Sequence, residues 1–149
     1  MNVLIVSHRD EEPLNLDAFV ELATFTLQRE DAPSNAEVSI AIVDTDEIAR
    51  LNQNYRKKAG STDVLSFPND QPDMVVDDEE PIVLGDIVIA PEVAKTNAAE
   101  LGHSIEEELN LLLVHGVLHL MGYDHEEDED AAVMQTRERV ILQAWAIHV

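Results

Sequence analysis

Residues 104–125 read SIEEELNLLLVHGVLHLMGYDH, and this stretch decides how the chain folds. Ser104 followed by Glu107 is the pattern of a capping box, in which each side chain accepts a hydrogen bond from the other residue's backbone N–H at a helix start. The long apolar run behind it predicts a largely buried helix. Gly122 is typical of the residue just past a helix end, because glycine adopts positive φ without strain. The sequence therefore predicts one strongly apolar helix that ends at Gly122.

This helix carries two histidines on one face. His115 and His119 are four residues apart, a spacing that brings their Cβ atoms within about 5–6 Å of each other. His125 follows Gly122 by three residues, so it can swing back after the turn as a third ligand. Three neutral imidazoles with an open fourth position are the ligand set of a catalytic zinc site. We predict one Zn²⁺ per chain, held by His115, His119 and His125.

The spacing of the histidines equals that of the metzincin peptidases, H-E-x-x-H-x-x-G-x-x-H. One position departs from that pattern. Gly116 stands where the peptidases carry the glutamate that acts as general base. Glycine has no side chain that can take a proton. The sequence therefore favours a zinc-binding scaffold whose chemistry is not peptide hydrolysis.

Composition narrows the class of protein. The 149 residues suit a single domain spanning 1–149. Cysteine is absent, which excludes disulfides, iron–sulfur clusters, thiolate zinc sites and a cysteine nucleophile. No apolar stretch reaches the about 20 residues of a membrane span, and the N-terminus lacks the features of a signal peptide. We expect a cytoplasmic protein that binds no membrane.

Charge is distributed unevenly along the chain. With 9 Lys+Arg against 31 Asp+Glu, the net charge is −22, and a protein this acidic repels phosphate at long range. Four of the nine basic residues nevertheless fall within nine positions, namely Arg50, Arg56, Lys57 and Lys58. This basic cluster is the one place where a polyanion could bind.

Helical and strand patterns alternate along the chain. Hydrophobic residues recur at helical spacing in some segments and at every second position in others. The predicted fold class is α/β (α+β): a single layered domain with helices packed on a mostly four-stranded mixed sheet, and a zincin-like helix bearing the histidines. Strands are expected over 2–6, 38–42, 64–67 and 82–90; helices over 16–28, 44–55, from 91, over 105–121 and over 127–146; and a mobile acidic connection over 69–81.

Three further motifs identify a family. They are NQNYRKK at 52–58, STDVLSFP at 61–68 and LGDIVI at 84–89. Together with the three histidines, they closely resemble the YbeY family of bacterial rRNA maturation factors, over about residues 40–145. The resemblance implies a single-strand-specific, metal-dependent endoribonuclease that acts in 3′-end maturation of 16S rRNA and in ribosome quality control. It also implies that single-stranded ribosomal RNA and the small ribosomal subunit or its assembly proteins are partners, whereas DNA is not expected.

The resemblance also assigns residues. The three histidines match the metal ligands of the family, and Arg56 matches its arginine in the cleft near the metal. A guanidinium grips phosphate oxygens with a rigid fork and stabilises charge that develops at phosphorus. Lys57 and Lys58 would add positive potential for binding the substrate. Either zinc-activated water or the 2′-hydroxyl of the RNA would attack, and the sequence leaves this choice open.

Two carboxylates are candidates for a supporting role. Asp86 could orient a metal-bound histidine or simply end a turn, and Asp124 flanks the last ligand.

The alternative to an enzyme is a non-catalytic ribosome assembly factor in which zinc only stiffens the fold. Three histidines with an open position argue against that alternative, because structural zinc sites usually have four protein ligands.

Overall fold

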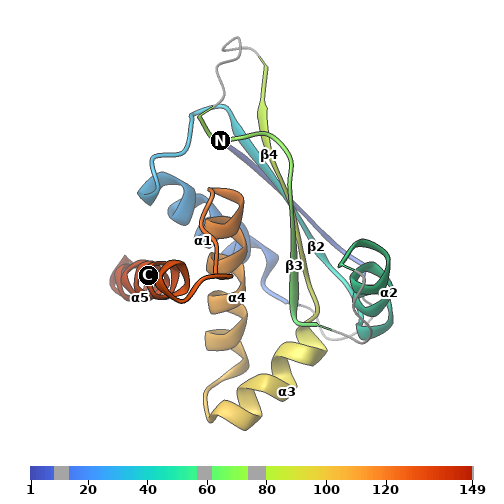
Figure 1. Cartoon of the computed structure of the whole chain (residues 1–149). Coiled ribbons are helices and arrows are strands. Elements are labelled where there is room, and N and C mark those ends of the chain that lie inside the picture. The colour runs from blue at the N-terminus through green and yellow to red at the C-terminus, as the bar shows by residue number, and fades with distance from the viewer. Residues whose placement is uncertain (9–13, 57–61, 74–79, 149) are drawn as a thin grey trace.

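The computed structural model describes residues 1–8, 14–56, 62–73 and 80–148, without the side chain of Arg56. Strands and helices alternate in the first part of the chain, and helices alone follow the last strand (Figure 1). The elements are β1 (Asn2–Ser7), α1 (Leu16–Arg29), β2 (Ala36–Ile42), α2 (Thr45–Arg56), β3 (Val64–Pro68), β4 (Ile82–Ile89), α3 (Pro91–Leu101), α4 (Ile105–Leu120) and α5 (Asp128–His148).

The four strands form one mixed sheet in the order β1-β2-β4-β3. β1, β2 and β4 run parallel, whereas β3 lies at an edge and pairs with β4 in the antiparallel direction. The predicted four-stranded mixed sheet is therefore confirmed. One expected boundary shifts slightly, since β4 ends at Ile89 and Ala90 becomes the N-cap of α3, which begins at Pro91 as expected.

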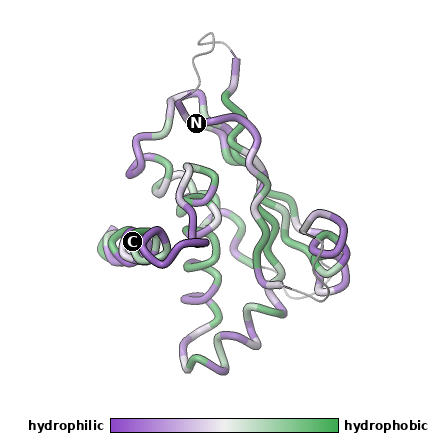
Figure 2. Tube along the Cα trace, viewed as in Figure 1, coloured by the Kyte–Doolittle hydropathy of each residue, from purple (hydrophilic) through white to green (hydrophobic). Residues whose placement is uncertain are grey.

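Helices cover the two faces of the sheet unequally. On the inner face, Val38, Ile40 and Ile42 of β2 pack into a core shared with α1, α4 and α5. On the outer face, Ile48 of α2 packs in a smaller cluster with Leu65 of β3. Figure 1 shows α2 across the sheet from α4, and Figure 2 shows hydrophobic residues along the strands and α4. The alternation of side chains along β2 explains how one strand serves both layers.

The local signals at the start and end of α4 are confirmed. The Glu107 N–H donates to Ser104 Oγ at 3.1 Å, and the Ser104 N–H donates to Glu107 Oε1 at 3.3 Å. The helix ends at Leu120, and Gly122 follows with φ of +105°. That backbone conformation favours glycine. The chain therefore turns back immediately after α4.

Asp44 caps the N-terminus of α2. Its Oδ1 accepts from the Glu47 N–H at 2.8 Å, while the Glu47 carboxylate pairs with Arg50 at 2.6 Å.

The predicted acidic connection over 69–81 includes residues 74–79, which lie outside the described residues. Its beginning is anchored, because the Val83 N–H donates to Asp70 Oδ2 at 2.9 Å.

α4 crosses the sheet at close range where Gly116 faces β4. A Cβ built on Gly116 would lie 2.9 Å from Ile87 Cγ2, and Ile87 is fully buried. No larger side chain, glutamate included, fits there unless the packing shifts. The contact between helix and sheet thus requires glycine at position 116, where the peptidases carry their glutamate.

We expect Gly116→Ala to lower the free energy of unfolding by about 1 kcal/mol. Overpacking costs about 1–3 kcal/mol, and the better helix propensity of alanine offsets about 1 kcal/mol of it. Urea titration of the variant measures the change. In the double variant Gly116→Ala/Ile87→Ala, the loss should be smaller than the sum of the two single losses, because the clash is removed. Additive losses would contradict the close contact.

Candidate metal centre

The three predicted ligands gather at the C-terminal end of α4. His115 and His119 lie on the helix, and His125 lies in the loop beyond Gly122. The ring centroids of His115 and His125 are 5.3 Å apart, and those of His119 and His125 are 6.0 Å apart. Imidazoles bound to one tetrahedral zinc at Zn–N distances of about 2.0–2.1 Å have centroids roughly 5 Å apart. The rings therefore lie near the spacing that zinc requires.

The arrangement is not yet that of a completed ligand set. Within the described part of the chain, no three His, Asp or Glu side chains converge closely enough to hold an ion. The zinc site accordingly stays a prediction.

Each histidine of α4 has one nitrogen already engaged. His115 Nδ1 lies 3.2 Å from Glu138 Oε1, and Glu138, on α5, is 6% exposed. His119 Nδ1 lies 3.0 Å from the carbonyl oxygen of Tyr123. Because a carbonyl or a carboxylate accepts, each Nδ1 carries the hydrogen and donates it. Nε2 of each ring is then left with its lone pair, as in most metal-bound histidines. The residues thus fit a zinc ion.

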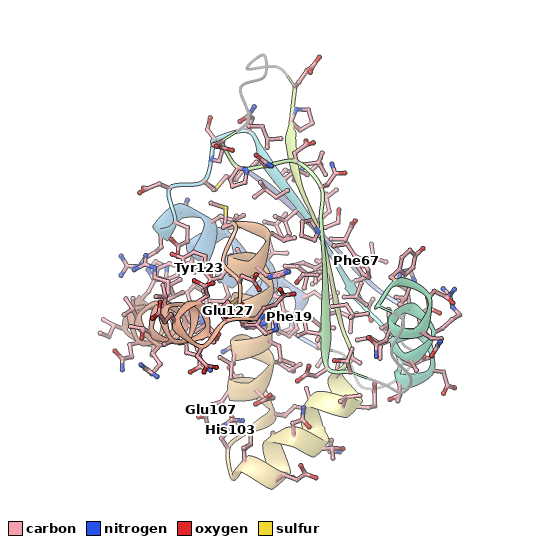
Figure 3. The ribbon with its side chains drawn as sticks, viewed as in Figure 1. Phe19, Phe67, His103, Glu107, Tyr123 and Glu127 are labelled. Atoms are coloured by element: carbon pink, nitrogen blue, oxygen red, sulfur yellow. The ribbon has the colours of Figure 1, made fainter. Side chains whose placement is uncertain are left out.

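Glu138 and the Tyr123 carbonyl are the partners that sequence reasoning missed. The loop that supplies the carbonyl is tied to the rest of the fold by the Tyr123 hydroxyl, which donates to Glu30 Oε1 at 3.1 Å. Glu30 also accepts from Arg137 Nε at 2.8 Å. Burial, followed by the nearby Glu30 carboxylate, raises the pKa of the Tyr123 phenol, so it stays protonated and donates. Figure 3 labels Tyr123 at the far end of α4 from His103 and Glu107.

Glu138→Ala is expected to weaken zinc binding about 10–100-fold, the usual cost of losing a partner that orients a ligand. The physical reason is that His115 would lose the acceptor that fixes its tautomer and ring orientation. Competition against a chelator of known affinity measures the change. Glu129→Ala, which removes the same charge from the exposed first turn of α5, serves as control. Equal zinc affinity in both variants would contradict the role of Glu138.

Burial also tunes the acidity of His119. Burial, more than any other influence, holds the pKa of its imidazole below the ordinary value, and the neighbouring His115 and His125 add to this. The Tyr123 carbonyl and Asp124 act in the opposite direction. A lowered pKa keeps the ring neutral, which is the form that binds metal.

The pH dependence follows from that direction. Zinc and protons compete for the histidines, so occupancy falls as pH falls. Because the pKa of His119 is lowered in the folded protein, this ring stays neutral at the ordinary value of about 6.5 and takes up a proton only at lower pH. An NMR titration of the metal-free protein should therefore show His119 protonating at a pH below the ordinary value of about 6.5. Protonation of His119 above pH 6.5 would contradict this assignment.

The two carboxylate candidates have different positions. Asp124 Oδ1 accepts from the N–H of His125 at 2.6 Å and from that of Glu126 at 3.1 Å. It therefore shapes the backbone that presents His125 instead of bonding to an imidazole. Asp86 is exposed on the outer face of β4, across the sheet from α4. The structure does not bring it to the histidines, so a role in orienting them does not fit.

A bulge explains the position of Asp86. Strict alternation from Ile82 and Leu84, both in the inner core, would point Asp86 inward. At Gly85, however, φ is +146°, and the pairing of β2 with β4 shifts by one residue. The extra residue reverses the order of the faces, so Ile87 turns inward and Asp86 outward.

The basic cluster lies partly outside the described residues. Arg56 is the last residue of α2, which packs on the outer face of the sheet, and Lys57 and Lys58 lie outside the described residues. The histidines belong to the inner side.

Comparison with known proteins places the chain in a family. The family model described as Endoribonuclease YbeY matches residues 6–146. A protein named Endoribonuclease YbeY from Nocardioides sp. is 43% identical, over 89% of this chain and 91% of its own length. One of the same name from Acidothermus cellulolyticus is 45% identical, over 85% and 80%. The solution structure of TM1509 from Thermotoga maritima superimposes with a TM-score of 0.63 at 27% identity, over 98% of this chain and 93% of that one. The chain therefore belongs to the endoribonuclease YbeY family.

Proposed function

We propose that this protein is a zinc-dependent endoribonuclease that cleaves single-stranded RNA. Its substrate would be the 3′ end of 16S rRNA. The protein would also act in ribosome quality control, and its partners would be the small subunit or its assembly proteins. The observation that carries the proposal is the gathering of three histidine rings, two of them with Nδ1 already donating. The family names of the relatives support RNA as the substrate.

The residues of the chain divide the work as follows. A bound zinc would supply Lewis acidity, which activates water and stabilises negative charge at phosphorus. His115, His119 and His125 would hold it, and Glu138 and the Tyr123 carbonyl would keep the α4 rings oriented. Arg56 would grip the scissile phosphate, and Lys57 and Lys58 would attract the strand.

The alternative is a ribosome assembly factor with a purely structural zinc. Such a site usually needs a fourth protein ligand. Asp86 lies on the outer face of the sheet, and Asp124 Oδ1 accepts two backbone N–H groups, so neither carboxylate favours a fourth protein ligand. The histidine set with an open position therefore supports the enzyme.

Measurements on a single protein preparation distinguish the endoribonuclease from the assembly factor. Bound metal and cleavage of a single-stranded RNA are measured together, before and after treatment with a chelator, and with zinc restored. We expect about one zinc per chain, cleavage that stops with the chelator and returns with zinc, and no cleavage of the same RNA in a duplex. Tight zinc binding without any cleavage would favour the structural site. The ends of the products, cyclic phosphate or not, identify the 2′-hydroxyl or water as nucleophile.

We place this activity in the cytoplasm, where ribosomes are assembled. Among the described residues, no helix is long and apolar enough to cross a membrane.

A further inference from the structure

A hollow of about 510 Å³ opens directly beside the candidate metal centre. His115 and His125 lie on its wall, and α4, α5 and the start of β3 enclose it. Its volume falls within the about 300–1,000 Å³ typical of small-molecule sites. A substrate strand that places one phosphate at the histidines would bring a neighbouring nucleotide to this hollow.

Part of the hollow is apolar. Val64 of β3, Leu111 and Leu112 of α4, and Ala131 and Met134 of α5 line it. Such side chains can cover the faces of a planar ring. A nucleobase that has left its stack needs this kind of contact, since single-stranded RNA is recognised through unstacked bases.

Three anchored carboxylates line the remainder. Asp63 Oδ2 accepts from Asn97 Nδ2 at 3.0 Å. Glu108, 4% exposed, meets His103 Nε2 at 2.5 Å, and Glu138 meets His115 as described above. Each bond holds its carboxylate in place, while an ionised carboxylate keeps about four acceptor sites in all. His103 thus fixes a wall of the hollow.

The charges decide which part of a nucleotide can enter. Carboxylates repel phosphate, and Arg139 at the rim is the one cation among the described lining residues. Arg139 is exposed, and its Nη2 donates to Thr136 Oγ1 at 3.3 Å. A base with N–H donors suits the carboxylates, whereas the phosphate of the same nucleotide suits Arg139 at the rim. An acidic protein can in this way gain affinity for RNA through bases.

We propose that this hollow is the subsite for one unpaired base next to the cleaved bond, and that it prefers guanine over uracil. The inference rests on the proposed function. Guanine presents two neighbouring donors, N1–H and the N2 amino group, which match the two oxygens of a carboxylate. Uracil presents a single donor, N3–H, between two carbonyl oxygens that a carboxylate repels. Arg139 holds the phosphate of the bound nucleotide.

Binding of free nucleosides tests the subsite without cleavage. Guanosine, inosine and uridine are titrated into the zinc-loaded protein, and the methyl NMR signals of Val64, Leu111, Leu112 and Met134 are followed. Guanosine should shift these signals. Inosine, which lacks only the N2 amino group, should bind about tenfold more weakly, the cost of one hydrogen bond to a charged group. Uridine should bind more weakly still.

A matched pair of variants locates the binding. Ala131→Trp fills the hollow, whereas Val133→Trp places the same side chain two residues away on α5, where Val133 is 61% exposed and lines another hollow. Ala131→Trp should abolish the methyl shifts, and Val133→Trp should keep them. Thermal melting confirms that both fold; the nucleoside series in the unaltered protein is decisive even if one does not.

The outcomes separate this inference from the proposed function. Equal affinity for guanosine and uridine, or guanosine binding that survives Ala131→Trp, overturns the subsite even where RNA is cleaved. In a single-stranded RNA pool, cleavage should be biased toward guanine at one fixed position beside the cut, and Ala131→Trp should remove the bias. Guanosine binding in a protein that cleaves no RNA would support the hollow and contradict the nuclease.

Discussion

His119→Ala is expected to abolish RNA cleavage and to weaken zinc binding by more than the about 10–100-fold that loss of an orienting partner costs. The reason is that His119 would be a direct ligand. Its ring lies on the same helix as His115, its Nδ1 donates to the Tyr123 carbonyl, and burial keeps it neutral. Loss of this ring leaves two of the three predicted ligands.

The measurement must separate a lost ligand from a lost fold. Zinc content, zinc affinity and cleavage of one single-stranded RNA are compared in His119→Ala and in His8→Ala, which removes an exposed histidine outside the site. We expect His8→Ala to match the unaltered protein, and His119→Ala to keep its circular dichroism spectrum. If His119→Ala retains full zinc affinity and full cleavage, the three-histidine centre is wrong.

Local signals in the sequence were sufficient for α4. Ser104, Glu107 and Gly122 act through backbone groups within a few residues, so their effect does not depend on the rest of the fold. The spacing of His115 and His119 is likewise a property of any helix. For these reasons the helix, its ends and the face carrying the histidines could be predicted.

Tertiary contacts escaped the same reasoning. Glu138 is 23 residues from His115 in sequence, and it is one acid among 31 acidic residues, so nothing local marks it as the partner. The prediction that Asp86 orients a metal-bound histidine does not fit the structure for a related reason. Its face depends on the bulge at Gly85, where a Cβ would lie 2.2 Å from the Phe67 carbonyl oxygen on β3. The glycine was visible in the sequence, but the close approach that requires it comes from the neighbouring strand.

The basic cluster poses the sharpest question about this site. Arg56 ends a helix on the outer face of the sheet, whereas the histidines lie on the inner side. A guanidinium bound to the scissile phosphate, as the family resemblance implies for Arg56, acts where charge develops. Loss of one such donor typically costs about 10²–10³ in rate.

Arg56→Ala is therefore expected to slow cleavage about 10²–10³-fold while zinc content and fold are kept. Arg56→Lys should recover only part of the rate, because an ammonium keeps the charge but not the two-pronged geometry. Lys57→Ala and Lys58→Ala should weaken RNA binding mildly and flatten its salt dependence.

Arg50→Ala, on the same helix but paired with Glu47, controls for the loss of a charge. Single-turnover cleavage of one RNA, with zinc measured in every variant, makes the comparison. Cleavage at the unaltered rate would make Arg56 a surface charge, and loss of zinc or early melting would make it structural.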